Sequence, residues 1–324
     1  MKQKKLIGVV LASLLVLSGC ASSAVKENGK DVVASIDNQS ILADDLYDKL
    51  TSSSQGETAL FSYILDELIK ENFPVDKNMK EYADELINNL ETNYQNQYGD
   101  DADAQIESLL AQYGYDSLDG WRNDILHSLQ YSEFVKKYVK DNFDEVFDDY
   151  YQVESPRIIS LIKVSMSDVE NPTDEEKEKL NEVKDLLATD KSFAEIATDY
   201  SDDNTSSAKG NLGVVDSQTG LKSTYGDDVE SAALALKEGE VSDAIVGNDG
   251  YYFLYCTSQN KETIKKELKT VDINSPLLTY DDYIQYLAYN TYDIQYGDET
   301  IEKQIKGFIE ENLKARDEQR GGQS

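Results

Sequence analysis

The chain has 324 residues, of which 31 are lysine or arginine and 63 are aspartate or glutamate, so its formal net charge is −32. A surface this acidic repels phosphate, which argues against nucleic acid and anionic lipid headgroups as charge-driven partners. It attracts cationic unfolded segments, although an acidic surface also serves solubility alone. The length allows about two domains.

Residues 1–19 have the pattern of a signal peptide: a basic start precedes an apolar run over residues 6–17, shorter than the about 20 residues that span a bilayer. The segment ends in Leu-Ser-Gly-Cys at Cys20, which resembles the lipobox of bacterial lipoproteins. The resemblance implies a diacylglycerol on Cys20 and a lipid-anchored protein on the extracytoplasmic face of the cell membrane. The alternative is a plain signal peptide or anchor helix with an incidental cysteine. Residues 20–30 are predicted to be a polar tether.

Residues 31–155 are predicted to form a mainly helical domain. Asp31 to Ile41 reads as a strand, a turn at Asp37-Asn38 and a second strand. Helical spacing of apolar residues begins near Ala43. Four apolar stripes at this spacing follow, over residues 60–69, 82–94, 106–113 and 121–139.

Residues 156–260 are predicted to form a compact α/β unit with the order βααβαβ. A run rich in β-branched and apolar residues, Arg157 to Val164, indicates the first strand, and Tyr251 to Thr257 the last. Thr173 and Glu176 have the spacing of a capping box that opens a helix. The remaining elements are expected at residues 193–200, 210–215 and 229–236.

Helical spacing returns after Pro276, within residues 261–318. Two amphipathic helices cannot form a core alone, so we expect them to pack on the N-terminal helices, with the α/β unit inserted between. Residues 319–324 are predicted to be a disordered tail. The fold class is therefore α+β.

Several blocks of the α/β unit resemble the parvulin (PpiC-like, rotamase) family of peptidyl-prolyl cis-trans isomerases. The whole chain resembles the PrsA-type foldase lipoproteins. This implies a helical chaperone-like domain, similar to those of SurA and PrsA, with an inserted parvulin-like domain around a small antiparallel-rich sheet. The matching blocks are Phe193–Ala197, Tyr200–Asp203, Ala208–Gly213, Ala233–Ser242 and Asn248–Tyr251.

The chemistry that this resemblance implies is rotation about the bond before a proline. That rotation has a barrier of about 18–20 kcal/mol, and no covalent bond breaks. The enzyme needs an apolar pocket for the proline ring and a few polar groups aimed at the twisting amide. No cofactor or metal is predicted, since the chain has one histidine, His127, and no clustered cysteines.

The sequence departs from the family at the two histidines that active parvulins usually carry. The first position falls at Ser160 and the second at Tyr252, while the central Cys or Asp of the family is retained as Asp203. The resemblance thus makes Asp203, Ser160 and Tyr252 the catalytic candidates, and hydrogen bonds among them would preserve a polar floor. Serine, tyrosine and aspartate are also ordinary residues at the surface of a strand, so these three positions need not have a catalytic role. His127 lies in the helical part and is interpreted as a surface or packing residue.

The proline pocket of the family also changes. Positions that are often Met, Phe and Phe become Tyr225, Val229 and Leu234, and Leu212 is kept, so these four are the predicted substrate-binding residues. The pocket stays apolar but loses its aromatic wall. Cys256 lies in an apolar run and is interpreted as a packed strand residue; with Cys20 acylated, no disulfide is predicted.

The first functional hypothesis is a membrane-anchored foldase for unfolded or partly folded exported polypeptides, with weak or lost isomerase activity. The alternative is a non-catalytic chaperone or peptide-binding lipoprotein in which an inactive parvulin unit serves for docking. A solute-binding lipoprotein of a transporter is a third hypothesis, against which the long helical stripes argue. A homodimer is left open as the state of assembly.

Overall fold

The computed structural model describes residues 25–37 and 39–321. The predicted signal peptide, Cys20 and the start of the tether lie outside the described residues. The chain divides into two compact units, of which the first ends at Ser62 and the second begins at Tyr63. Within the described ranges, no helix combines the length and the apolar character needed to cross a membrane.

The first unit contains a three-stranded antiparallel sheet, β1 (Lys26–Glu27), β2 (Lys30–Ile36) and β3 (Gln39–Leu42), followed by helix α1 (Ala43–Thr51). β2 and β3 form the predicted strand–turn–strand, in which Ile36 pairs with Gln39. β1 lies within the segment predicted as a tether, so the end of that segment belongs to the sheet.

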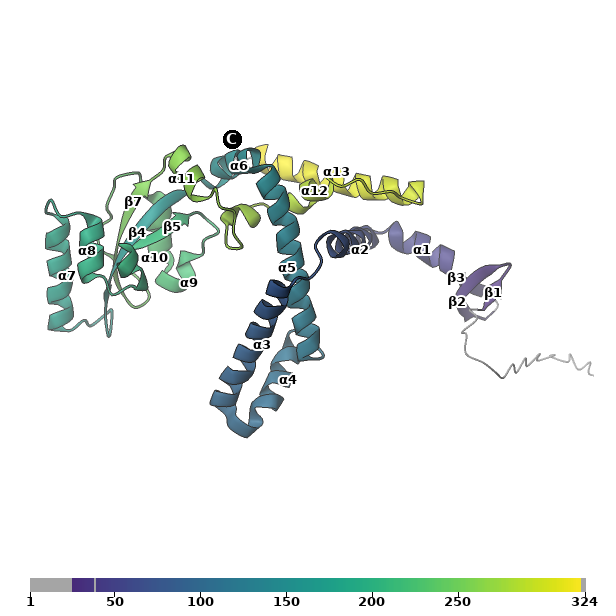
Figure 1. The fold of residues 1–324 in the computed structure, drawn as a ribbon, viewed down its shortest axis with the longest axis horizontal. Helices are drawn as coiled ribbons and strands as arrows, with labels where there is room; N and C mark the ends of the chain where they lie inside the picture. The colour runs from purple at the N-terminus through teal and green to yellow at the C-terminus, as the bar shows by residue number, and fades with distance from the viewer. Residues whose placement is uncertain (1–24, 38, 322–324) are drawn as a thin grey trace, which may run out of the picture. The chain divides into compact units, whose positions relative to one another are not determined.

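The helices that follow match the four predicted stripes, and a break at Asn142 separates one further helix from the fourth. Helix α2 crosses the boundary between the two units and ends before Pro74, and α3 begins after an N-cap in which Asp76 accepts a hydrogen bond from the Met79 amide. α3 lies beside α4 and α5 (Figure 1). The helices are α2 (Ser54–Asn72), α3 (Lys77–Tyr98), α4 (Ala102–Gln112), α5 (Leu118–Asp141) and α6 (Phe143–Glu154).

The parvulin-like part of the second unit is built on a four-stranded sheet with strand order β5-β4-β7-β6, in which every neighbouring pair is antiparallel. The predicted capping box is present, since Thr173 and Glu176 accept hydrogen bonds from each other's backbone amides. The predicted α+β class with a small antiparallel sheet is therefore confirmed. Its elements are β4 (Arg157–Ser165), α7 (Asp174–Leu187), α8 (Phe193–Tyr200), β5 (Asn211–Val215), α9 (Leu221–Tyr225), α10 (Asp227–Ala235), β6 (Ile245–Val246) and β7 (Gly250–Ser258).

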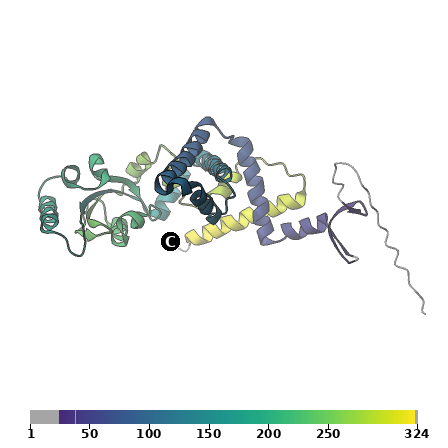
Figure 2. The same cartoon turned by 90° about the horizontal axis from the view of Figure 1, so that it is seen from below.

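Helices cover both faces of this sheet (Figure 2). Successive side chains of a strand point to opposite faces, so β4 and β7 contribute to two separate cores. One core joins Ile162, Val164 and Phe253 to α7 and α8. The other joins Leu161 and Leu254 to α9 and α10, and this second side is called the pocket face below.

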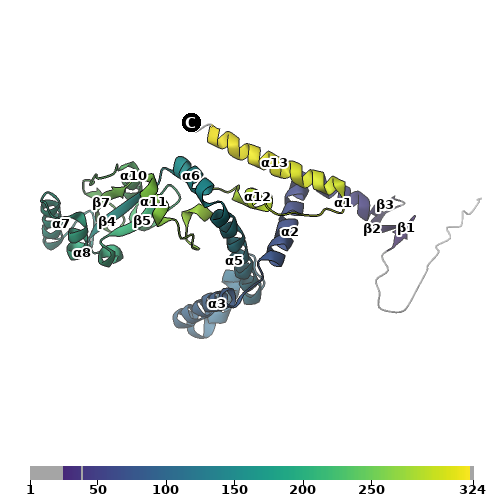
Figure 3. The same cartoon turned by 45° about the horizontal axis from the view of Figure 1, so that its top comes forward.

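The C-terminal segment contains α11 (Lys261–Glu267), α12 (Ile284–Tyr289) and α13 (Glu299–Gly321), with a 3-10 turn at Pro276–Leu278. α12 lies beside α5 and α13 (Figure 3). The helix expected directly after Pro276 is thus split in two. The first part of the predicted tail also needs correction, because α13 continues through Gly321 and so includes residues 319–321.

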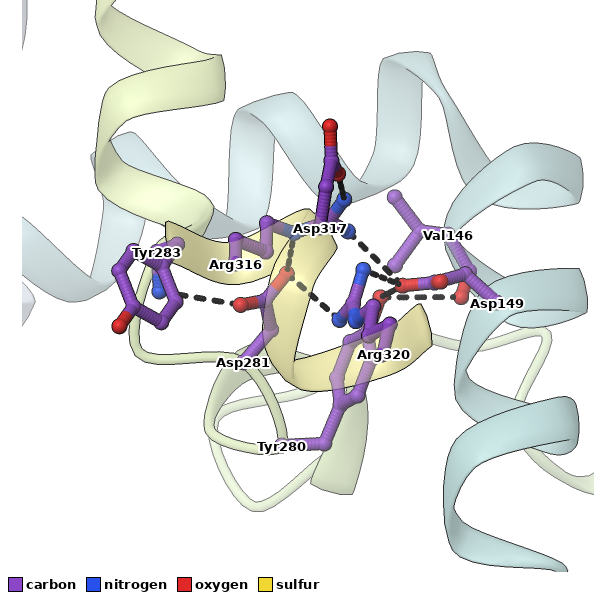
Figure 4. A network of polar contacts seen from close by, with 8 residues as sticks. All are labelled: Val146, Asp149, Tyr280, Asp281, Tyr283, Arg316, Asp317 and Arg320. Carbon is purple, nitrogen blue, oxygen red and sulfur yellow. Dashed lines mark hydrogen bonds and ion pairs between the residues drawn. The ribbon is translucent and has the colours of Figure 1, made fainter. Parts of the chain in front are cut away.

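Two arginines explain why the end of α13 is ordered. Arg316 and Arg320 both contact Asp281, at Nε–Oδ2 2.7 Å and Nη2–Oδ2 3.0 Å, and both contact Asp149 of α6, at 2.9 Å and 2.8 Å (Figure 4). The Tyr280 hydroxyl donates to the Asp149 carboxylate at 2.7 Å. These five residues, called the arginine cluster, attach α13 to α6.

Candidate functional site

The pocket face is lined by apolar side chains from both central strands. Ile159 and Leu161 of β4 and Leu254 and Cys256 of β7 are fully buried there. The predicted substrate-binding residues lie on this face. Leu212, Tyr225 and Leu234 are partly buried against the core, whereas Val229 is fully buried within it. Leu212, Tyr225 and Leu234 therefore keep part of their surface accessible on this face, whereas Val229 does not.

Tyr252 occupies the centre of the polar part of this face. Its side chain is fully buried, and its hydroxyl donates a hydrogen bond to Asp249. Its ring meets the ring of Tyr225 edge to face, with centroids 5.6 Å apart. Burial, followed by the bond to Asp249, raises the pKa of Tyr252, so the hydroxyl remains a neutral donor.

A glycine makes room for this tyrosine. A Cβ atom at Gly247 would lie 2.4 Å from Cε2 of Tyr252 and 2.3 Å from the carbonyl oxygen of Tyr225. The Tyr252 ring therefore rests directly on the backbone at Gly247, and a larger residue at this position would displace the ring.

Lys163 completes the arrangement from the neighbouring strand. It pairs directly with Tyr252 across β4 and β7, and its Nζ lies 2.5 Å from Oδ2 of Asp249. The bond from Lys163, and next that from Tyr252, holds the pKa of Asp249 below its ordinary value. We did not predict Lys163 or Asp249 from the sequence. The available signal was a lysine in the middle of the apolar run of β4.

Asp203 also lies at this face, and its side chain has local partners. It caps the 3-10 turn Asn204–Ala208, where Oδ1 accepts from the Thr205 amide at 2.9 Å and from the Thr205 hydroxyl at 2.6 Å. Burial, followed by the charge of Asp203, raises the pKa of Tyr225. Asp203 thus lies near Tyr225, and the Tyr225 ring contacts the ring of Tyr252.

Ser160 is not part of this group. It pairs with Tyr255 and lies between Ile159 and Leu161, whose side chains point to the pocket face. Its Oγ lies 3.4 Å from Oγ1 of Thr257, and it faces the side covered by α7 and α8. A shift of one residue along a strand moves a side chain to the other face. The polar floor envisaged for Ser160, Asp203 and Tyr252 therefore lacks Ser160, and Lys163 and Asp249 lie there instead.

The remaining candidate residues lie in packed or peripheral positions. Cys256 is fully buried in β7, and burial raises the pKa of its thiol, so the sulfur packs as a neutral group. His127 lies on α5, where its Nε2 is 3.1 Å from Oδ1 of Asp66.

The contacts on this face limit what it offers to a substrate. Tyr252 donates to Asp249, Tyr225 lies near Asp203, and Asp249 is paired with Lys163. We call these five residues the pocket-face cluster. Stabilising a twisted amide requires polar groups aimed at the substrate. In this cluster the polar groups are aimed at one another.

The sheet, its helices and the pocket face define a parvulin-type unit, and residues 161–258 match the family model described as Rotamase: PPIC-type PPIASE domain. Over nearly its whole length the chain is similar to the foldase protein PrsA of Staphylococcus aureus. It is 30% identical to the proteins of strains bovine RF122 and Newman, over 99% of this chain and 97% of theirs. The chain belongs to the PrsA foldase family.

Solved structures of PrsA proteins are also similar to this chain. Those from Bacillus subtilis and Streptococcus pneumoniae are each 20% identical, with a TM-score of 0.39. Each match covers 86% of this chain, and 98% and 99% of the respective solved chains.

Proposed function

We propose that this protein is a lipid-anchored foldase on the extracytoplasmic face of the cell membrane, which binds unfolded or partly folded exported polypeptides. Membership in the PrsA foldase family supports the foldase role. The Leu-Ser-Gly-Cys motif at Cys20 supports the anchor, and the net charge of −32 favours basic unfolded segments as clients.

The single observation that carries the proposal on catalysis is the closed set of contacts in the pocket-face cluster. Because Tyr252 is fully buried and bonded to Asp249, it cannot act on a substrate amide without breaking this bond. Isomerase activity is therefore weak or lost, and the protein acts mainly by holding polypeptides.

A proline-peptide isomerisation assay tests this point. At micromolar protein, the expected rate equals the uncatalysed background, which is slow because uncatalysed isomerisation takes tens to hundreds of seconds. A rate well above background that is lost in Asp203→Ala, but kept in the control variant Asp185→Ala on the exposed side of α7, would establish catalysis and overturn the proposal.

The second candidate function is peptide docking by an inactive parvulin-like unit. The partial exposure of Leu212, Tyr225 and Leu234 on one face favours it. Leu234→Glu would then weaken binding of a proline-containing peptide, measured by calorimetry, while the isomerisation rate stays at background. Equal binding by the variant and the native protein would exclude docking at this face.

Membrane attachment is tested at Cys20. Cys20→Ala is expected to fold normally and to leave the membrane fraction, because two acyl chains at one cysteine supply the anchoring energy. Retention in that fraction after removal of the first 19 residues would contradict a lipid anchor.

A further inference from the structure

The connection between α4 and α5 is a fixed turn that presents aromatic side chains. Gly114 has a left-handed backbone (φ +81°) and its amide bonds the Ala111 carbonyl, while the Tyr115 amide bonds the Leu110 carbonyl at 2.9 Å. This is the Schellman arrangement, in which the residue after the glycine contacts the helix. The Tyr115 hydroxyl donates to Asp124 of α5 at 2.7 Å, so both ends of this residue are held.

An apolar cavity of about 240 Å³ lies at this turn, lined by Leu109, Leu110, Tyr113, Tyr115 and Trp121. Tyr113, one of the lining residues, is 70% exposed. Sites for whole small molecules usually measure about 300–1,000 Å³. This cavity therefore suits one apolar side chain of a longer ligand.

A second, acidic hollow of about 520 Å³ adjoins the cavity and shares Leu110 and Tyr115 with it. The residues that line it include four carboxylates and no lysine or arginine, and none of the four forms an ion pair within the described part of the chain. The carboxylates belong to Glu91, Asp103, Glu107 and Asp116.

We propose that the cavity and the acidic hollow together form a docking site for an extended polypeptide segment in which an apolar side chain is flanked by lysine or arginine. The inference rests on the proposed function, because it names the kind of client segment that the foldase holds. The apolar side chain enters between Tyr113, Tyr115 and Trp121, and the flanking cations face the carboxylates of the hollow. Charge complementarity selects this occupant, since an acidic or neutral segment would leave the four carboxylates without partners.

The site has features of a recognition surface. Tyrosine and tryptophan supply large contact areas at low cost in conformational entropy, and they dominate binding energy at interfaces. Because Tyr115 is held by its backbone and its hydroxyl, the wall of the cavity is formed before the ligand arrives, which reduces the ordering cost of binding.

Trp121 is the only tryptophan of the chain, so its fluorescence reports on this cavity directly. The full chain would be titrated with an unstructured, tryptophan-free peptide of leucine and lysine, and with a matched peptide in which glutamate replaces lysine. We expect a saturable change in Trp121 emission with the lysine peptide, weakened by salt, and no change with the glutamate peptide.

Three variants locate the binding energy. Tyr113→Ala is expected to weaken binding about tenfold, because it removes an aromatic contact of the cavity lining. The double variant Glu107→Gln with Asp116→Asn is expected to weaken it about threefold and to reduce the salt dependence. Tyr82→Ala, at a 49% exposed tyrosine of α3 that does not line the cavity, is the control and should bind as the native chain does.

In parallel, we would measure whether the chain suppresses the aggregation of a reduced, unfolded client protein. This assay tests the proposed foldase function separately from the proposed docking site. If the native chain suppresses no aggregation, the proposed foldase function fails. If it suppresses aggregation but Trp121 does not respond and Tyr113→Ala binds the lysine peptide normally, this site is overturned and the function stands. If emission changes with protein concentration alone and Tyr113→Ala abolishes that change, a second copy fills the cavity and the client proposal is wrong.

Discussion

Two clusters of the second unit combine carboxylates, tyrosines and cations, and they differ in burial. In the arginine cluster, the Asp281 side chain is only 2% exposed and Arg316 16%. In the pocket-face cluster, Lys163 is also 16% exposed, but its partner Asp249 is 58% exposed. Both place a tyrosine hydroxyl on a carboxylate that also binds a cation.

The comparison shows that similar contacts have different consequences in different surroundings. A buried carboxylate cannot be hydrated when its partners are removed, so the arginine cluster must remain intact for α13 to stay on α6. An exposed carboxylate regains water, so Asp249 orients Tyr252 at small energetic cost. The first cluster therefore maintains the fold, and the second determines how the candidate site is arranged.

The largest effect is expected in the arginine cluster. Asp281→Ala leaves Arg316 and Arg320 without their shared buried partner, and breaking a buried pair by removing one partner costs about 3–5 kcal/mol. Urea unfolding measures this loss. Asp249→Ala is the matched variant and should cost less, about 1–2 kcal/mol, since its mostly exposed carboxylate makes only a weak ion pair but is also the acceptor of the buried Tyr252 hydroxyl. Equal losses in the two variants would invalidate the comparison.

The next largest effect is steric. Gly247→Ala would place a methyl group against the Tyr252 ring and the Tyr225 carbonyl, and overpacking of this kind costs about 1–3 kcal/mol. Thermal unfolding of the variant should show this loss. Gly297→Ala, where a Cβ atom would meet nothing within 4 Å, is the control. If the Gly247 variant were as stable as this control, the Tyr252 ring would have to adopt another position at no cost in stability.

A smaller effect is expected from Tyr252→Phe, which removes one hydroxyl and leaves Asp249 paired with Lys163. The loss of one intramolecular hydrogen bond costs about 1 kcal/mol in the free energy of unfolding. The prolyl isomerisation rate should be the same in the variant and the native chain. A lower rate in the variant would give the Tyr252 hydroxyl a catalytic role.

The smallest effect is expected in the pH dependence of stability. The pKa of Asp249 is lowered in the folded state, so its contribution to stability is complete above the ordinary aspartate pKa of about 3.9 and is lost as the pH falls below that value. Asp249→Asn should therefore lower stability at pH 6 and match the native chain near pH 2, as followed by denaturant midpoints. A difference in stability between the variant and the native chain that increases as the pH falls would contradict this prediction.

Local patterns in the sequence were sufficient to predict most elements of the fold. The apolar stripes predicted α2 to α5, the capping box at Thr173 and Glu176 marked the start of α7, and the apolar runs predicted β4 and β7. The predicted elements follow from side-chain periodicity and short-range hydrogen bonds, which the sequence contains directly. The grouping of Leu212, Tyr225, Val229 and Leu234 on one face was implied by the resemblance to the parvulin family and by no local pattern.

Only the tertiary structure decided which polar residues meet. Ser160 and Tyr252 look equivalent in sequence, but strand register puts them on opposite faces, because the side-chain period of a strand is two residues. Arg316 reaches Asp149, 167 residues away in the chain, and Lys163 reaches Asp249 across 86 residues. Such contacts depend on how elements pack, so no local pattern indicates them.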